Sequence, residues 1–448
     1  MRRYDNDAYH PFNHHFFERG ISPFFFSIMF PEFPEVRCMK KKGAQVSLRH
    51  IKEDFAQDGG YNEQSLAYWY GAAVSEMLYR VVFIAKLNNE PLLDDEAFTA
   101  VDSTFSLYAS LVTNGEFLPS LGDNKGPIID PILKLGIIMT DNQACKELYG
   151  YRKGIGPYPE HLEKYYVNNN TGFIVARSGV DKKPNAFYML AKVNSGTSGH
   201  NHMDMLSMDI KLRGEWFVSE PYSGKLYSRY RMKSIQRGYC YNMESHNTVL
   251  CYGEPILSWE KYANRFGIYR PDAHITEVNK YDDGLYVSAY HYGYTFCSHT
   301  RSVLFSDNGS MIVRDVIGRG NRLGKPHIQR WNLEPGVGLE LVDNKTVILT
   351  KGDIKYLWLF DRAMELKAYR QTELLAEYFS DDQIGYTLDA YFSTEITPGK
   401  ESAMNVSLTT MMIDITDKSY DIETLQEKCS RLGKSLSDES SFEELKSL

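Results

Sequence analysis

The stretch NSGTSGHNHMDMLSMD, residues 194–209, carries the strongest signal for both the fold and the chemistry. A loop rich in Gly and Ser leads into His200, His202 and Asp204, which occupy alternate positions. Alternate side chains of an extended segment point to one face, so these three are expected to converge. Two imidazoles and a carboxylate beside a flexible loop suit acid–base chemistry or metal binding. The alternative is a hydrogen-bonded surface cluster without a chemical role.

The sequence that follows has the pattern of β-strands. In residues 206–212, four apolar residues alternate with Ser207, Asp209 and Lys211, which predicts a half-buried strand. Short runs of β-favouring residues between Gly, Asn and Asp turns continue to about residue 415. We therefore predict a large antiparallel β-sandwich over residues 165–415.

The sequence before this region has helical periodicity. Residues 62–87 and 94–112 carry apolar residues at helical spacing, and residues 16–30 look like a buried helix closed by Pro31 and Pro34. The segment YRKGIGPYPE, residues 151–160, is rich in Gly and Pro and marks the boundary between the two regions. After the strands, residues 421–448 predict a helix with a frayed polar end.

Composition limits the classes of function. The 448 residues carry a formal net charge of −8, which argues against a nucleic-acid-binding protein but allows a local basic cleft for an acidic glycan. The 32 Tyr and 23 Phe suit either sugar binding or aromatic packing. The six cysteines are scattered, so neither a disulfide scaffold nor a cysteine-rich zinc module is indicated. No run approaches the roughly 20 apolar residues of a membrane span. The start lacks the apolar core of a signal peptide, so we expect a soluble protein.

Two further polar side chains extend the first cluster. Glu220 lies in EWFVSEP, residues 215–221, and His246 lies in MESHNTVL, residues 243–250. Two neutral imidazoles and a carboxylate are a reasonable ligand set for Zn²⁺, so His202, Glu220 and His246 form a candidate metal site. Between them, residues 223–234 contain two tyrosines next to arginines, which suits an acidic sugar or, alternatively, an exposed aromatic loop: Tyr227, Arg229, Tyr230 and Arg231.

The helical region holds two short polar motifs. FNHHFFERG, residues 12–20, presents Asn13 and His14, and DGGYNEQSLAYWYG, residues 58–71, presents Glu63, Gln64 and Tyr68 at a helix start. Each motif, taken alone, is better explained as a structural feature than as a functional one.

Together, and in this order, these motifs resemble those of the heparinase II/III-like polysaccharide lyases, a family that includes heparin and alginate lyases. In that family a Gly-His-x-His-x-Asp motif leads a strand, an acidic residue and Pro follow the next strand, and His-Asn-Thr completes the set. The similarity runs from about residue 10 to residue 260. It implies an incomplete (α/α) toroid in residues 1–150 and a β-sandwich domain in residues 165–415. The helical tail in residues 421–448, predicted from the sequence pattern, follows them.

The resemblance also implies a reaction, the β-elimination of uronic-acid-containing polysaccharides such as glycosaminoglycans or alginate. By position in the motifs, Asn13 and His14 match the pair that holds the uronate carboxylate, and Tyr68 matches the tyrosine that acts as acid. His200 matches the base of the sheet domain, and Tyr230 lies near the leaving group. Glu63, Gln64 and Arg229 are expected at the substrate. His202, Glu220 and His246 match a structural zinc site. Family members are bacterial and often periplasmic.

Three departures from the family pattern leave other functions open. The Asn-His motif begins at residue 13, where family members usually have several preceding helices. Trp69 stands where a His often follows the tyrosine, and Glu220 stands where Asp is usual. A non-catalytic glycan-binding or polysaccharide-assembly protein with the lyase fold is therefore an alternative. A glycoside hydrolase would need a pair of carboxylates, and no acidic pair is obvious near the histidines.

Overall fold

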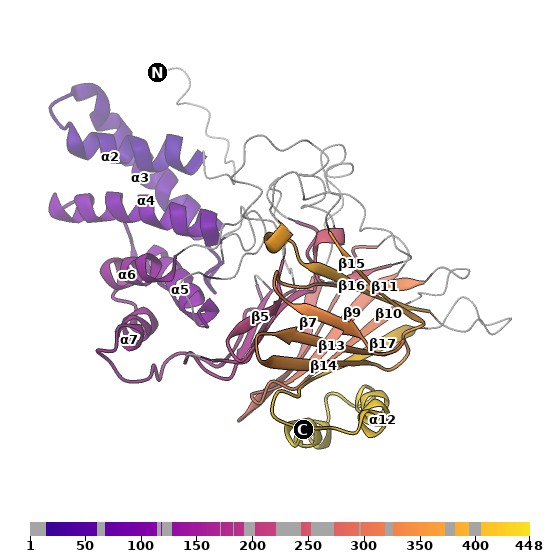
Figure 1. The fold of residues 1–448 in the computed structure, drawn as a ribbon. Coiled ribbons are helices and arrows are strands. Elements are labelled where there is room, and N and C mark those ends of the chain that lie inside the picture. Colours follow the sequence, from indigo (N-terminus) through magenta and orange to yellow (C-terminus); the bar gives the residue numbers. More distant parts are fainter. Residues whose placement is uncertain are drawn as a thin grey trace. The chain divides into compact units, whose positions relative to one another are not determined.

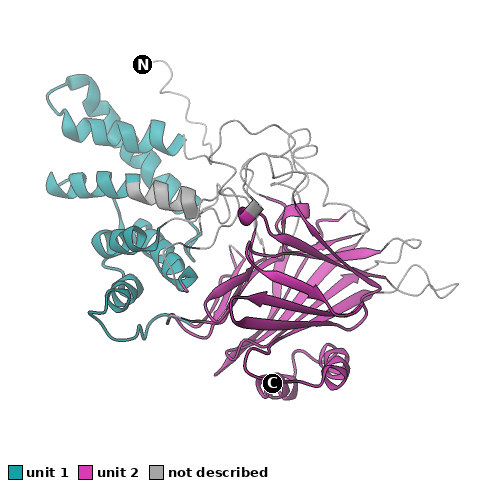
Figure 2. Cartoon of the chain, in the orientation of Figure 1, with its two compact units in different colours: residues 1–112, 116–163, 196–201 teal, residues 113–115, 164–195, 202–448 magenta. Residues whose placement is uncertain are grey.

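The computed structural model describes residues 15–60, 68–113, 118, 128–170, 172–181, 183–191, 202–220, 243–251, 273–294, 297–318, 326–371, 381–393 and 405–448. The chain divides into two compact units (Figure 2). Unit 1 comprises residues 1–112, 116–163 and 196–201, and unit 2 comprises residues 113–115, 164–195 and 202–448. The main change from unit 1 to unit 2 therefore follows the Gly- and Pro-rich segment at residues 151–160.

Unit 1 is built from helices (Figure 1). They are a π-helical turn η1 (Phe16–Ile21), α2 (Ser22–Met29), α3 (Pro34–Asp54), α4 (Tyr68–Leu87), α5 (Asp95–Leu111), α6 (Ile129–Thr140) and α7 (Gln143–Arg152). None of the helices within the described ranges is long and apolar enough to cross a membrane.

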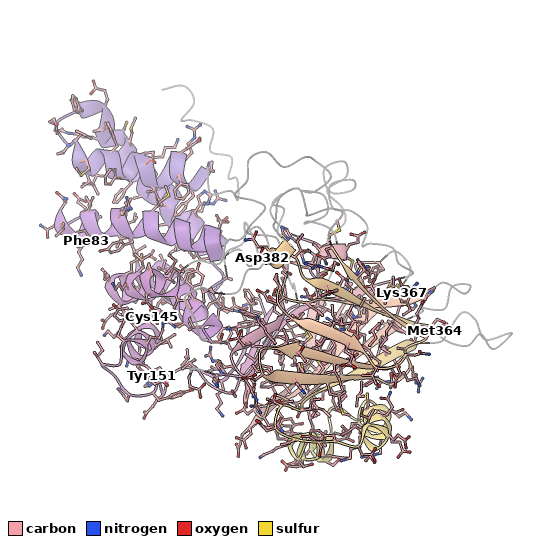
Figure 3. The ribbon with its side chains drawn as sticks, in the orientation of Figure 1. Phe83, Cys145, Tyr151, Met364, Lys367 and Asp382 are labelled. Carbon is pink, nitrogen blue, oxygen red and sulfur yellow. The ribbon has the colours of Figure 1, made fainter. Side chains whose placement is uncertain are left out.

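A capping residue explains where α5 begins, and a glycine explains how closely α5, α6 and α7 pack. The Asp94 side chain accepts a hydrogen bond from the Ala97 N–H at 3.0 Å and so begins α5, as the sequence predicts. Gly136 of α6 has no side chain and leaves room for two neighbours, Phe105 of α5 and the buried Cys145 of α7 (labelled in Figure 3). The Cys145 Sγ donates to the Phe105 carbonyl at 3.5 Å. A methyl group at Gly136 would lie 2.8 Å from the Cys145 Sγ.

The aromatic segment at residues 16–30 differs from the predicted single buried helix. It forms η1 followed by α2, and only one face is buried, because Phe26 and Phe30 are exposed. Pro34 does not close this helix but begins α3, where its missing N–H and fixed φ are well tolerated.

Unit 2 contains strands that pair antiparallel in three sheets (Figure 1). In the described ranges the first sheet has the order β1-β2-β3-β4-β5, the second β12-β13-β14-β17-β10-β9-β8-β7 and the third β15-β16-β11-β6. The strands are β1 (Tyr165–Val167), β2 (Phe173–Arg177), β3 (Ala186–Leu190), β4 (Ser207–Leu212), β5 (Glu215–Val218), β6 (Val249–Leu250), β7 (Ala273–Tyr281), β8 (Gly284–His291), β9 (Ser298–Ser306), β10 (Met311–Gly318), β11 (His327–Asn332), β12 (Gly338–Leu341), β13 (Thr346–Lys351), β14 (Ile354–Phe360), β15 (Glu365–Arg370), β16 (Tyr386–Phe392) and β17 (Val406–Asp414). Two short 3₁₀ helices, η2 (Met243–Ser245) and η3 (Asp381–Gln383), interrupt them.

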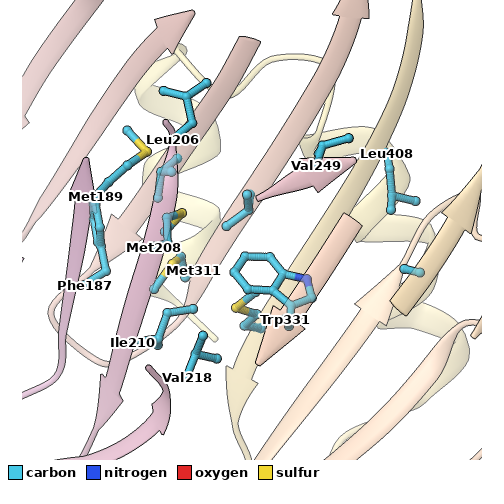
Figure 4. Packing of buried hydrophobic residues seen from close by; sticks show 14 of the residues in the cluster. Phe187, Met189, Leu206, Met208, Ile210, Val218, Val249, Met311, Trp331 and Leu408 are labelled. Carbon is cyan, nitrogen blue, oxygen red and sulfur yellow. The ribbon is translucent and has the colours of Figure 1, made fainter. Parts of the chain in front are cut away.

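One continuous apolar core takes side chains from all three sheets (Figure 4). Phe187 of β3 contacts Phe305 of β9 edge-on, with ring centroids 5.6 Å apart. Trp331 of β11 contacts Trp358 of β14 in the same way at 5.3 Å. Aromatic pairs of this geometry add to the free energy gained from burial, so they bind the sheets to one another.

Strand β4 corrects two predictions. It begins at Ser207, not Leu206, and all six of its residues are buried, so it is not half-buried. Leu206 has a φ of 57° and ends a turn, and residues 202–206 do not form a strand. The strand alternation that was expected to align His202 with Asp204 is therefore absent.

The end of the chain is also more ordered than predicted. Instead of a frayed polar end, helix α12 (Ile422–Leu432) is followed by α13 (Glu439–Lys446). Both helices pack on the eight-stranded sheet through a second apolar cluster, in which the ring of Phe442 stacks on Tyr281 at 4.1 Å. The apolar residues of α13 are few, but their spacing places Phe442 and Leu445 on the buried face.

Candidate metal centre

Three residues of unit 2 that the sequence singles out lie together. His202 precedes β4, Glu220 follows β5, and His246 lies between η2 and β6. All three side chains are buried. One imidazole nitrogen from each histidine and one carboxylate oxygen of Glu220 lie within 4.8 Å of one another. Segments far apart in the sequence therefore bring two imidazoles and a carboxylate to one point.

The contacts within this cluster suit a cation. The Nδ1 of His246 lies 2.9 Å from Oε1 of Glu220, and the rings of His202 and His246 have centroids 5.3 Å apart. The second oxygen of Glu220, Oε2, is buried and has no hydrogen-bond partner in the described part of the chain. A buried carboxylate oxygen normally has a partner or coordinates a metal.

Zinc fits this donor set. Zn²⁺ takes histidine nitrogens and carboxylate oxygens at about 2.0–2.2 Å, which places neighbouring ligand atoms of a tetrahedral site about 3.4 Å apart. Ligand atoms that already lie within 4.8 Å of one another would need only small side-chain rotations to reach that arrangement. The replacement of the family's usual Asp by the longer Glu220 is compatible with this geometry.

Asn247, next to His246, joins the elements around the cluster. Its backbone N–H donates to the Ser207 Oγ at 3.0 Å, and its side-chain amide donates to Asp209 Oδ1 at 3.2 Å. Its side-chain oxygen accepts a hydrogen bond from the Asn332 N–H at 2.7 Å. Asn247 therefore connects the five-stranded sheet to β11 of the four-stranded sheet, directly beside a candidate ligand.

The surroundings of the cluster are acidic. Burial raises the pKa of the Asp209 carboxyl well above its ordinary value, and the nearby carboxylates of Glu220 and Glu334 raise it further. Asp204 is buried in the same segment as His202. Carboxyl groups gathered away from water favour the binding of a positive charge.

The other predicted site residues cannot be placed in a site. Asn13, His14, Glu63, Gln64, His200, Arg229 and Tyr230 lie outside the described residues. Tyr68 is the first residue of α4, and its side chain lies outside the described part. Sequence reasoning assigned no role to Asn247 or Asp209, because a buried hydrogen-bond network has no fixed spacing along the chain.

The sequence was compared with known protein families and with functionally curated proteins. Residues 167–400 match the family described as heparinase II/III-like, C-terminal. Among functionally curated proteins, none matches the sequence.

Solved structures with the same fold include two heparinases III and a heparan sulfate lyase. A heparinase III superposes with a TM-score of 0.74 at 13% identity over 92% of this chain and 62% of its own. A second heparinase III gives 0.74 at 15% identity over 94% and 61%. The heparan sulfate lyase HepC from Pedobacter heparinus gives 0.71 at 17% identity over 94% and 64%. The chain thus spans less than two thirds of the length of these structures.

Proposed function

The chain belongs to the heparinase II/III-like family, and on that premise we propose that it is a polysaccharide lyase that cleaves uronic-acid-containing polysaccharides by β-elimination. The observation that carries the proposal is the family match over residues 167–400, which includes His202, Glu220 and His246. The buried cluster of these three residues lies where the family resemblance implies a zinc site. The heparinase and heparan sulfate lyase folds favour a glycosaminoglycan as the substrate.

The proposal includes an architecture. The helices of unit 1 would be part of an (α/α) toroid, and the sheets of unit 2 would form the β-sandwich domain. The succession of helices α2–α7 along unit 1 supports the first assignment. The apolar core that the sheets of unit 2 share supports the second.

The chemistry of β-elimination explains why the motifs contain these types of residue. The C5 proton of a uronate is difficult to remove while its carboxylate keeps full charge. Donors on Asn13 and His14 would hold that carboxylate and stabilise the charge that develops on it. His200 would take the proton, or Tyr68 on some substrates, and Tyr68 would protonate the departing 4-oxygen with Tyr230 nearby. Glu63, Gln64 and Arg229 would position the sugar.

Zinc would have a structural role in this scheme. His202, Glu220 and His246 would hold it, and when bound it would supply a fixed cross-link between three segments of unit 2. His202 lies two residues after His200, so a fixed His202 would limit the positions that His200 can reach.

An absorbance assay for the unsaturated product tests the proposal. The full chain is incubated with heparan sulfate, chondroitin sulfate, hyaluronan and alginate, and at least one should yield product. Tyr68→Phe removes only a hydroxyl and should lower turnover about 10²-fold or more, as expected for a general acid–base group. Tyr70→Phe is the matched control on the same helix and should retain activity.

Two results would contradict the proposal. Equal turnover by wild type and Tyr68→Phe would remove Tyr68 from the mechanism. Binding of a polymer without any product would instead support the non-catalytic glycan-binding alternative.

A further inference from the structure

Arg301 of β9 is a buried cation with a complete set of acceptors. Its Nε donates to Oδ1 of Asp315 on β10, and its Nη2 donates to Oδ2, each at 2.8 Å. Both side chains are fully buried. This two-point contact with a carboxylate fixes the plane of the guanidinium group.

The remaining nitrogen of Arg301 connects two segments of backbone. Its Nη1 donates to the Leu206 carbonyl at 2.7 Å and to the Asn247 carbonyl at 2.6 Å. Leu206 lies four residues after His202, and Asn247 directly follows His246. One Nη1 group therefore holds together the two segments that carry the candidate histidine ligands.

Neither segment is part of a regular ladder at these positions. Beside the bonds from Arg301, the two segments are joined directly by the Met208 N–H, which donates to the Asn247 carbonyl at 3.3 Å, and by the Thr248 Oγ1, which donates to the Met205 carbonyl at 2.9 Å. Leu206 has a φ of 57°, a conformation that residues other than glycine rarely adopt and that persists only when its surroundings hold it. Its N–H donates to the Leu190 carbonyl at 2.6 Å, and its own carbonyl accepts from Arg301. The segment at residues 246–248 is likewise bent, between η2 and β6.

Asp315 is itself held from two other directions. It accepts hydrogen bonds from His299 Nε2 and from Gln329 Nε2, each at 2.7 Å. Gln329 belongs to the four-stranded sheet, whereas His299 and Asp315 belong to the eight-stranded sheet. Although burial opposes ionisation, the charges of Arg301 and His299 hold the pKa of Asp315 below its ordinary value. Arg301 is thus anchored to the rigid sheets on one side and to the two irregular segments on the other.

We propose that Arg301 is a positioning residue of the metal centre, which sets the separation of His202 and His246 through the carbonyls of Leu206 and Asn247. This inference rests on the proposed zinc site. A buried ion pair alone contributes little net stability, since desolvation offsets much of the attraction. Removing one partner of such a pair destabilises the fold strongly, because it leaves a buried charge uncompensated. In a folded variant of Arg301, zinc binding should weaken by more than the lower folding stability alone would cause.

The test measures zinc affinity and ligand geometry in the full chain. Zn²⁺ affinity is obtained by competition with a chromophoric chelator, and the visible spectrum of bound Co²⁺ reports the coordination geometry. Arg301→Lys keeps the charge but cannot reach Asp315 and both carbonyls together. We expect its zinc affinity to fall about tenfold or more, as for partners that orient ligands, with an altered Co²⁺ spectrum.

Control variants separate positioning from folding. Thr410→Val removes a hydrogen bond from the Thr410 Oγ1 to Gln329 in the same network, and this bond does not reach either ligand segment. It should lower the unfolding temperature but leave zinc affinity and the Co²⁺ spectrum unchanged. If Arg301→Lys does not fold, Arg301→Gln combined with Asp315→Asn replaces it, because this pair leaves no buried charge.

The outcomes are distinct. A folded Arg301 variant with wild-type zinc affinity and an unchanged Co²⁺ spectrum overturns the positioning role while the metal site stands. A wild-type chain that binds neither Zn²⁺ nor Co²⁺ overturns the metal site and the positioning role with it. Lyase activity is not needed for either conclusion.

Discussion

Lys211 of β4 is a buried lysine whose ammonium group lies among packed side chains. Its Nζ donates to the Thr113 Oγ1 at 3.0 Å and lies 4.5 Å from the centre of the Trp216 ring. Burial lowers the pKa of the ammonium group from 10.5 to about 8. The folded chain therefore releases this proton at a lower pH than the unfolded chain does.

This difference predicts a pH-dependent stability. Between about pH 8 and pH 10.5 the unfolded chain binds more protons at Lys211, so the free energy of unfolding should rise with pH from this group. The gain is complete above the unfolded pKa and is lost as the pH falls through about 8. Lys211→Met keeps the length of the side chain and removes the titration. Denaturant unfolding of both proteins from pH 7 to pH 10 should give a difference that grows with pH, and a constant difference would contradict the assignment.

At the residue scale, the proximity of His202, Glu220 and His246 could be predicted from the sequence, and the contacts that surround this cluster could not. His202, Glu220 and His246 stand out because two imidazoles and a carboxylate form a known ligand chemistry. Their grouping did not come from strand alternation, since residues 202–206 are not part of a strand. The contacts of Arg301 and Asn247 could not be found from the sequence. Arg301 donates to the carbonyls of Leu206 and Asn247, and Asn247 bonds to Ser207, Asp209 and the Asn332 N–H, all far away in the sequence.

At the scale of elements, two glycines of unit 1 occupy turns with a positive φ but differ in how closely other atoms surround them. Gly59 has a φ of 96°, and an added methyl group would lie 2.3 Å from the Ser103 carbonyl oxygen of α5. Gly154, after α7, has a φ of 70° but nothing within 4 Å of such a methyl group. The two positions share a left-handed backbone and differ in the space around them.

Alanine at the two positions should therefore have unequal effects. Gly154→Ala should lower the free energy of unfolding by about 1–2 kcal/mol, the cost of a left-handed non-glycine residue. Gly59→Ala adds a clash with the backbone of α5, which brings a further ~1–3 kcal/mol. Denaturant unfolding measures both, and equal losses would show that the space beside Gly59 adjusts at no cost.

Elements with local signals could be predicted well. The apolar periodicity of residues 94–112 predicts a helix there, and helix α5 spans Asp95–Leu111. Strand β4 was predicted as half-buried because Ser207, Asp209 and Lys211 are polar. In the folded chain Ser207 and Asp209 bond to Asn247 and Lys211 bonds to Thr113, so the polar face is buried as well. Partners of this kind come from distant segments and leave no periodic pattern.

At the scale of the whole molecule, zinc should stabilise the folded chain. A metal that binds only the folded state at about 100 times its dissociation constant adds about 2.7 kcal/mol to the free energy of unfolding. Thermal unfolding should therefore shift upward with Zn²⁺, return with a chelator and remain unaffected by Mg²⁺. Glu220→Gln keeps the size of the side chain and removes the charged ligand, so most of the shift should disappear. A variant that responds to zinc as the wild type does would exclude Glu220 as a ligand.

The family and the mixed architecture of helices and antiparallel sheets could also be predicted, because the motifs around His202 and His246 are specific and the periodicity changes near residue 160. The arrangement of the proposed catalytic residues stays a prediction. It requires Tyr68 of unit 1 and Tyr230 of unit 2 to act on one sugar linkage, which depends on groups far apart in the sequence.

The mass of the products after digestion in ¹⁸O-labelled water distinguishes β-elimination from hydrolysis. Elimination breaks the linkage without adding water, so the products should carry no ¹⁸O and the new non-reducing end should be one water lighter than a hydrolysis product. Heparan sulfate is the first substrate, followed by the other uronate polymers. Unsaturated, unlabelled products are the predicted result. Saturated products that contain ¹⁸O would identify a hydrolase, and the absence of products from every polymer would contradict the assignment as a lyase.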